Sequence, residues 1–238
     1  EVYNYAISHG KSFNFGDKKV NYFDKAFNSL INFEIKWNVK QMAEKDVFHK
    51  YDSLLSSNLK DYGVLNYMTS HDDGTPFDKE RKMPFKTATI LLLTPGTSQV
   101  YYGDESARDL SIEGTVGDAT LRSFMNWDAI AKNNETKQIL EHWQKLGQFR
   151  AIHPAIGAGR HQLISEENGL VFSRIRKEDK IIAGINLSKG NKVLNVSSIF
   201  KNGDIVNDFY SNQRMEVKDG KITLNSAFDI VLLEKNKL

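Results

Sequence analysis

Residues 64–73, VLNYMTSHDD, contain the pattern that decides the fold. A short apolar run from Val64 to Met68 ends abruptly in polar and acidic side chains. Residues 94–105, TPGTSQVYYGDE, repeat this arrangement, and an apolar, helix-like segment (85–94) joins the two. The order strand, polar tip, helix, strand, polar tip is typical of a parallel β/α sheet whose strand ends carry the chemistry.

Length and composition describe a globular protein of one large or two ordinary domains. The chain has 238 residues, of which 40% are hydrophobic and 26% are charged. Its net charge of +2 gives no field that favours nucleic acid or a membrane surface, and no apolar run approaches the roughly 20 residues that span a bilayer. Cysteine is absent, which excludes disulfides and thiolate metal sites. Because residue 1 is Glu1 and not Met, we expect a processed, truncated or engineered N-terminus.

The first part of the chain alternates between strand and helix patterns. The predicted elements, read from apolar periodicity, are a loop over 1–20, strands at 29–35, 64–68 and 98–102, helices at 38–62, 84–94 and 135–152, and a long loop at 104–127. Pro84 suits the first turn of its helix, and Pro95-Gly96 suits the end. Loops as long as 104–127 tend to be functional.

The last part of the chain has no convincing helical period. Short alternating runs predict strands at 161–164, 170–175, 181–186, 192–196, 205–208, 215–217, 222–224 and 230–233. Asn-Gly and Asp-Gly pairs between some of them favour tight hairpins. We therefore expect two domains, residues 1–157 with a parallel sheet and residues 158–238 with an antiparallel β-sandwich.

Taken singly, the acidic strand tips are weak signals. An Asp or a His at a strand end is more often structural than catalytic, and Tyr102 could be an aromatic packing residue. The two tips are more informative together, because they follow consecutive strands and ligands of parallel sheets bind outside the carboxyl ends of the strands. We expect Asp104 and Glu105 to be structural.

Five stretches together resemble the α-amylase family of glycoside hydrolases, most closely its bacterial periplasmic type. Residues 67–72 are similar to the fourth signature region of that family, and residues 94–105 to its eighth barrel strand. Residues 118–127 and 142–157 match the stretch that follows, and Glu1-Val2-Tyr3 is similar to the third signature region. The resemblance implies that the chain is the C-terminal part of a (β/α)8 barrel followed by a β-sandwich domain.

The resemblance assigns roles to three residues. Glu1 would be the general acid/base that protonates the leaving glycosidic oxygen. Asp72 would hold sugar hydroxyls and stabilise the oxocarbenium-like transition state, and His71 would hydrogen-bond the same sugar. Tyr3, Tyr67 and Tyr102 could stack on sugars or pack inside the protein.

Other parts of the family's site are missing from the sequence. A retaining enzyme needs an aspartate nucleophile in a Gly-Phe-Arg-x-Asp type signature, and the chain contains none. The resemblance implies that the intact enzyme can bind calcium through ligands upstream of this chain. Three barrel strands follow Glu1, whereas a barrel closes with eight, so we expect the N-terminal remainder of the barrel to be a partner of this segment.

The function implied is a retaining hydrolase that cuts α-1,4-glucosidic bonds in starch-like α-glucans. Two alternatives stay open: a non-catalytic carbohydrate-binding or scaffolding member of the fold, and a transglycosylase of the same family. The likeness favours a periplasmic or secreted location. We also expect Arg108, Asp118 and Arg122 to form a salt-bridge network that braces the long loop, and no metal-ligand spacing among His9, His49, His142 and His161.

Overall fold

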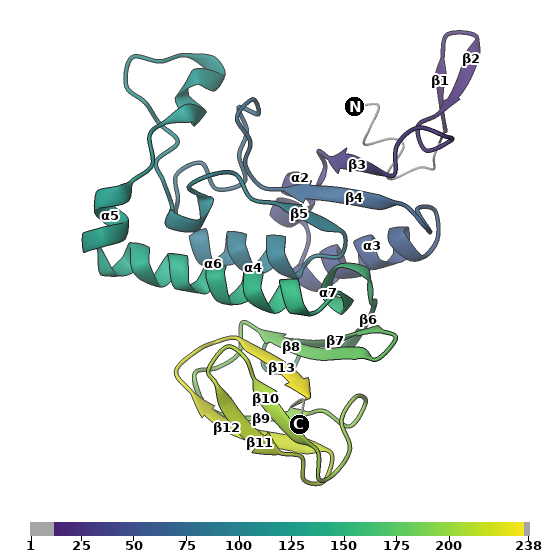
Figure 1. Cartoon of the computed structure of the whole chain (residues 1–238), viewed down its shortest axis with the longest axis vertical. Coiled ribbons are helices and arrows are strands. Elements are labelled where there is room, and N and C mark those ends of the chain that lie inside the picture. The colour runs from purple at the N-terminus through teal and green to yellow at the C-terminus, as the bar shows by residue number, and fades with distance from the viewer. Residues whose placement is uncertain (1–11, 236–238) are drawn as a thin grey trace. The chain divides into compact units, whose positions relative to one another are not determined.

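The computed structural model describes residues 12–235, which divide between Leu146 and Gly147 into two compact units. The division lies inside the long helix α6, and the expected domain boundary after residue 157 stays a prediction. The elements that begin in the first unit are β1 (Ser12–Phe15), β2 (Lys18–Asn21), β3 (Ser29–Asn32), α2 (Ile35–Gln41), α3 (Glu44–Ser56), β4 (Gly63–Tyr67), α4 (Pro84–Leu93), β5 (Thr97–Gln99), α5 (Trp127–Lys132) and α6 (Asn134–Ile152), with two short 3-10 helices, Asp104–Ser106 and Gly117–Arg122 (Figure 1).

The first unit is built on a parallel sheet in the order β3-β4-β5, with α3 and α4 on one side of it (Figure 1). Side chains alternate along the strands, so Leu30 and Val64 are buried while Ile31 on the other face of β3 is 44% exposed. Asn32, Asn66 and Ser98 lie opposite one another in the parallel register. Asn32 Nδ2 donates to Asn66 Oδ1 (2.7 Å), and Asn66 Nδ2 donates to the carbonyl oxygen of Pro95, in the turn before β5 (2.8 Å). The sheet therefore holds its three carboxyl ends side by side.

The turn between α4 and β5 requires a glycine. Gly96 has a φ of +104°, which disfavours any side chain, and a Cβ there would lie 2.7 Å from Val64 Cγ2. Pro84 occupies the first turn of α4, as its fixed φ predicts. These two residues explain why the predicted bounds of this helix agree with the structure.

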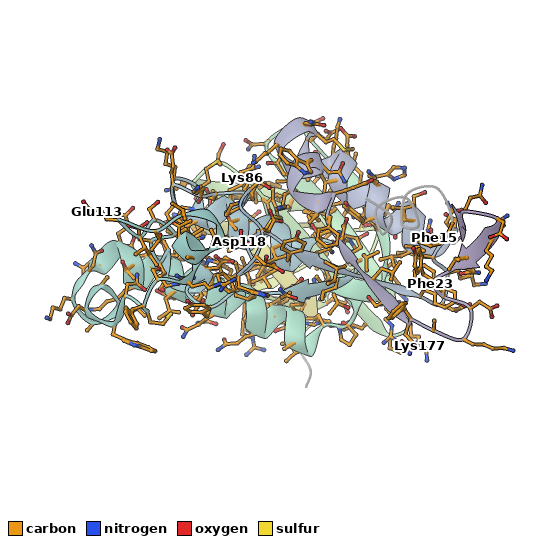
Figure 2. The ribbon with its side chains drawn as sticks, turned by 90° about the horizontal axis from the view of Figure 1, so that it is seen from above. Phe15, Phe23, Lys86, Glu113, Asp118 and Lys177 are labelled. Atoms are coloured by element: carbon orange, nitrogen blue, oxygen red, sulfur yellow. The ribbon has the colours of Figure 1, made fainter. Side chains whose placement is uncertain are left out.

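The strands predicted at 29–35 and 98–102 are shorter and end at Asn32 and Gln99. Two further expectations for the first unit are wrong. The predicted single helix over 38–62 is two helices, because the chain extends at Met42 (φ −118°, ψ 153°) and α3 restarts with Glu44 in its first turn. Residues 12–21, expected to be loop, form the antiparallel hairpin β1–β2 around Gly16, whose φ is +63°. Phe15 at the hairpin is 68% exposed, whereas Phe23 is buried against Tyr62 (Figure 2).

The second unit is an antiparallel β domain, and all eight predicted strands are confirmed. They are β6 (Arg160–Ser165), β7 (Leu170–Arg176), β8 (Asp179–Ile185), β9 (Gly190–Asn195), β10 (Ile205–Asp208), β11 (Gln213–Glu216), β12 (Lys221–Ser226) and β13 (Val231–Lys235), preceded by the short helix α7 (Ala155–Ala158). Six strands pair in the order β11-β10-β13-β8-β7-β6, and β9 pairs with β12. Val171 and Ile182 from the larger sheet share a buried cluster with Leu194 and Ile222 from the smaller one.

A buried histidine connects the start of this domain to its sheet. His153 is 4% exposed; its Nδ1 lies 2.7 Å from Asp179 Oδ1 and its Nε2 lies 2.8 Å from Glu234 Oε2. The second oxygen of Asp179 accepts the N–H of Ala155 (2.7 Å). The 153–155 segment is therefore held between two carboxyl groups, one from β8 and one from β13.

A candidate active site at the carboxyl end of the parallel strands

His71 and Asp72 stand exposed just after the central strand of the parallel sheet. Their side chains are 64% and 61% exposed, whereas Thr69 and Ser70 before them are buried. The Ser70 hydroxyl donates to Asp72 Oδ1 (2.8 Å) and accepts the backbone N–H of Asp72 (3.4 Å). His71 Nε2 lies 3.7 Å from Asp72 Oδ2. The structure therefore brings these two predicted residues together, with one Asp72 oxygen held by Ser70.

Asp73, the next residue, is held in a different way. Its carboxylate accepts hydrogen bonds from Lys36 Nζ, from the Tyr67 hydroxyl (2.7 Å) and, through Oδ1, from both the backbone N–H (3.0 Å) and the hydroxyl (2.9 Å) of Thr75. Its side chain is 16% exposed. Two adjacent carboxylates thus have opposite environments, one open to solvent and one enclosed by donors.

The electrostatics of this cluster favour a charged Asp73. Burial raises the pKa of the carboxyl, but the hydrogen bonds from Lys36, Tyr67 and Thr75 outweigh it and bring the pKa down to about 2. Burial, and then the hydrogen bond to the neighbouring carboxylate, raise the pKa of Tyr67. Burial also lowers the pKa of Lys36, against the opposing effect of Asp73.

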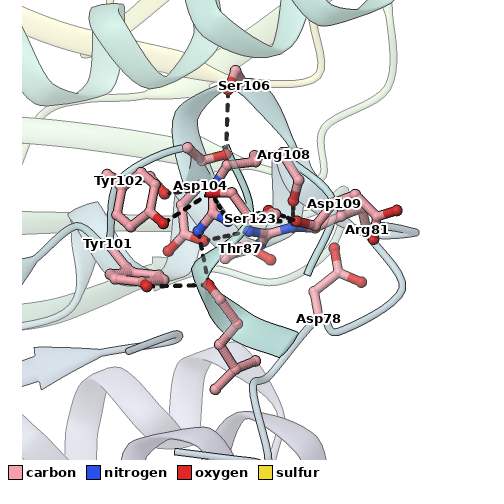
Figure 3. Close-up of polar contacts among 12 residues, drawn as sticks. Asp78, Arg81, Thr87, Tyr101, Tyr102, Asp104, Ser106, Arg108, Asp109 and Ser123 are labelled. Carbon is pink, nitrogen blue, oxygen red and sulfur yellow. Dashed lines mark hydrogen bonds and ion pairs between the residues drawn. The ribbon is translucent and has the colours of Figure 1, made fainter. Parts of the chain in front are cut away.

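The long loop after β5 is braced by one buried guanidinium (Figure 3). Arg108 is 1% exposed; its Nε donates to the carbonyl oxygen of Tyr102 (3.0 Å), and its terminal nitrogens donate to the carbonyl oxygens of Leu121 (3.2 Å) and Ser123 (3.1 Å). The guanidinium also lies 4.0 Å from the centre of the Tyr102 ring. Gly103, with a φ of +82°, leaves the necessary space, because a Cβ there would lie 2.4 Å from Arg108 Nε.

The expected salt-bridge network of Arg108, Asp118 and Arg122 is not what braces this loop in the described residues. Arg108 uses backbone carbonyls, and Arg122 Nε donates to the carbonyl oxygen of His71 (3.1 Å). Glu113 lies at the outer edge of the molecule, whereas Asp118 lies nearer its middle, where a Cβ on Gly74 would be 3.9 Å from Asp118 Oδ1 (Figure 2). Arg108 and Arg122 therefore do brace the loop, and the hydrogen bond from Arg122 reaches the backbone of His71 in the candidate site.

The first residue of the acidic tip after Tyr102 is buried beside an arginine. Asp104 is 1% exposed and its Oδ1 lies 2.8 Å from Arg81 Nη2, while Arg81 Nε donates to the carbonyl oxygen of Arg108 (2.7 Å) (Figure 3). Burial raises the pKa of Asp104, against the pairing with Arg81. This pair joins the loop after β4 to the loop after β5.

The remaining predicted residues have mixed outcomes. Glu1 and Tyr3 lie outside the described residues. Tyr67 is 2% exposed and packs edge-on against Phe33, whereas Tyr102 is 42% exposed and its hydroxyl donates to the carbonyl oxygen of Ser123 (2.9 Å). Sequence reasoning missed Lys36, because no local pattern pairs it with a residue 37 positions away.

No three His, Asp or Glu side chains within residues 12–235 are grouped so that they could bind a metal ion. The expectation that calcium ligands lie upstream of this chain stays a prediction. In the same residues, no helix is both long and apolar enough to cross a bilayer.

Comparison with known proteins identifies relatives of this fold and site. No protein-family model matches the chain. The chain is 32% identical over 176 residues to the periplasmic alpha-amylase of Escherichia coli (strain K12), a match that covers 73% of this chain and 25% of the relative. Its fold is similar to that of AmyP in complex with maltose (TM-score 0.63, 15% identity, 97% of this chain and 52% of that one). It is also similar to the α-amylase of Geobacillus thermoleovorans complexed with acarbose (TM-score 0.63, 16% identity, 88% and 49%).

A parallel β/α sheet followed by an antiparallel β domain defines the fold class of this chain. With the sequence relative, the class narrows to one family: the chain belongs to the α-amylase family of glycoside hydrolases. It spans about a quarter of the length of the curated relative and about half of each solved structure.

Proposed function

We propose that this chain is part of an enzyme that cleaves α-1,4-glucosidic bonds of starch-like glucans with retention of configuration. The observation that carries the proposal is the Asp72 carboxylate, 61% exposed at the carboxyl end of β4 beside His71. Asp73 is enclosed by donors and Asp104 is buried beside Arg81, whereas the Asp72 carboxylate is open to solvent, with Oδ1 held by Ser70 and Oδ2 lying 3.7 Å from His71 Nε2. The 32% identity to a periplasmic alpha-amylase supports the substrate class.

In the proposed reaction, Glu1 donates a proton to the glycosidic oxygen as the bond to the anomeric carbon breaks. An aspartate nucleophile bonds to that carbon, and water later hydrolyses the glycosyl-enzyme with Glu1 acting as base. The nucleophile lies outside this sequence. Asp72 binds hydroxyls of the same sugar and stabilises the positive charge that develops on its ring, and His71 adds a hydrogen bond.

We further propose that β3, β4 and β5 are consecutive strands of a (β/α)8 barrel and that the second unit is its C-terminal β-sandwich. Within residues 12–235, the exposed face and the outer edges of the sheet β3-β4-β5 support this, since parallel sheets occur with both faces covered. The N-terminal remainder of the barrel would cover them. We also propose that the intact enzyme can bind calcium through ligands upstream of this chain. We propose a periplasmic or secreted location as well, which the name of the periplasmic relative supports.

Two alternatives predict different products. A non-catalytic relative would bind maltoheptaose without consuming it, and a transglycosylase would form oligosaccharides longer than the substrate. The test is incubation of the intact enzyme with maltoheptaose, followed by sugar analysis and by proton NMR of the first anomer released. We expect shorter α-maltooligosaccharides, and their loss in Glu1→Gln. An initial β-anomer would contradict retention, and unchanged substrate would contradict hydrolysis.

A further inference from the structure

The candidate site rests on a buried ion pair that the family motif does not include. Lys36 lies in the first turn of helix α2, which follows the neighbouring strand β3. Its side chain is 3% exposed. Its ammonium binds Asp73 Oδ2, the carbonyl oxygen of Thr75 (3.1 Å) and the hydroxyl of Thr75 (3.3 Å). One cation therefore gathers three acceptors of the turn that follows His71 and Asp72.

The same turn is fixed from its other side by the strand it leaves. The Tyr67 hydroxyl donates to Asp73 Oδ2, and Lys36 Nζ lies 5.2 Å from the centre of the Tyr67 ring. The N–H of Phe77 donates to the carbonyl oxygen of Met68 (2.9 Å), which closes the base of the loop. Within this closed loop, the side chain of Asp73 is tied to Lys36 on helix α2.

We propose that Lys36 is a positioning residue for Asp72: by holding Asp73, it fixes the backbone from which the exposed Asp72 carboxylate projects. Ser70 anchors one side of Asp72, and the Lys36–Asp73 pair anchors the other. The inference rests on the proposed function, because Asp72 must contact substrate for its position to affect the rate.

The geometry explains why the Lys36–Asp73 ion pair can fix the position of Asp72. A catalytic side chain that is 61% exposed receives little packing of its own, so its placement depends on its neighbours. Displacement of a catalytic group by about 1 Å can lower a rate about 10²-fold. A buried ammonium with three acceptors has few alternative positions, whereas an exposed lysine would have many.

The test compares two lysine variants of the intact enzyme. Lys36→Met removes the cation and keeps most of the side-chain volume. The control, Lys50→Met, removes a lysine of α3 that pairs with Glu34 (3.2 Å), the residue before α2, but is 29% exposed. We expect kcat for maltoheptaose to fall about 10²-fold in Lys36→Met with KM changed less than about threefold, and Lys50→Met to remain near wild type.

A second measurement separates positioning from loss of folding. The Thr75 N–H, which binds Asp73 Oδ1, should exchange with solvent at least about tenfold faster in Lys36→Met, whereas the Phe77 N–H should keep its protection. Combining Lys36→Met with Asp73→Asn should lower kcat no further than either change does, because the two residues act as one unit.

Several outcomes overturn the proposal. An unchanged kcat in Lys36→Met, an equal loss in Lys50→Met, or an unchanged Thr75 exchange rate would each do so. If Lys36→Met does not fold, Tyr67→Phe removes one donor to Asp73 and should lower kcat about tenfold; a wild-type kcat there contradicts the proposal. A wild-type enzyme without activity on maltoheptaose contradicts the proposed function instead, and the Thr75 exchange still decides whether Lys36 holds the turn.

Discussion

The enclosed carboxylate of Asp73 should make the stability of the first unit depend on acid pH. Its pKa is about 2 in the folded protein against an ordinary value of 3.8. A lowered folded-state pKa contributes stability that is present above the unfolded value and lost as the pH falls from about 4 through about 2. A difference of about 1.8 pKa units corresponds to about 2.4 kcal/mol at most. Because the side chain is 16% exposed, we reduce this to about 1–2 kcal/mol.

The perturbation is Asp73→Asn, measured by urea unfolding at pH values from 6 to 2. Tryptophan fluorescence is suitable because all three tryptophans, Trp37, Trp127 and Trp143, belong to the first unit. At pH 6 the variant should be less stable by at least the amount above, since Lys36 loses its counter-charge. The gap should narrow by about 1–2 kcal/mol as the pH falls from 5 to 2, because wild-type Asp73 then becomes neutral too.

The control is Asp128→Asn, which removes a carboxylate that is 91% exposed on α5. Its unfolding free energy should stay close to that of the wild type across the same pH range. A gap between wild type and Asp73→Asn that stays constant from pH 6 to 2 would refute the assignment of Asp73 as an enclosed, charged group.

Three further outcomes are expected. Gly103→Ala should destabilise the first unit by about 2 kcal/mol or more, because the alanine would be strained at a positive φ and its Cβ would collide with Arg108. The control Gly114→Ala, with a φ of +77° and open space around it, should cost about 1 kcal/mol. Equal losses of unfolding free energy in urea for the two variants would contradict the close contact between Gly103 and Arg108. His153→Ala should lower the opening free energy of β7 and β8 amides in hydrogen exchange by about 3 kcal/mol, since it removes the buried imidazole that contacts Asp179 and Glu234; unchanged protection would argue against a stabilising role for His153. The 238-residue chain by itself should not hydrolyse starch in a reducing-sugar assay, and activity abolished by Glu1→Gln would show that its site is complete.

Much of the fold could be predicted because its signals are local. The eight strands of the second unit follow from alternating side chains and Gly-containing turns, and α4 follows from Pro84 and Gly96. The hairpin β1–β2 was missed although Gly16-Asp17 marks its turn. The break at Met42 carries no such signal, because apolar residues continue with helical spacing on both sides of it.

The candidate site also contains some residues that the sequence could predict and others that it could not. His71 and Asp72 could be predicted because they directly follow a strand and match a signature. Lys36 and Arg108 could not, since their partners are set by the packing of segments distant in sequence. The predicted salt-bridge network failed for a related reason: a sequence shows which charges are near one another, but not that buried carbonyl oxygens will take the place of carboxylates.

The central claim is that Asp72 acts on the substrate, and the most direct measurement is the kcat of Asp72→Asn in the intact enzyme on maltoheptaose. Asn keeps the size of the side chain and can still pair with Ser70, so folding should be retained. We predict a fall in kcat of about 10³-fold or more with an unfolding free energy within about 1 kcal/mol of the wild type. A wild-type kcat in Asp72→Asn would contradict the account.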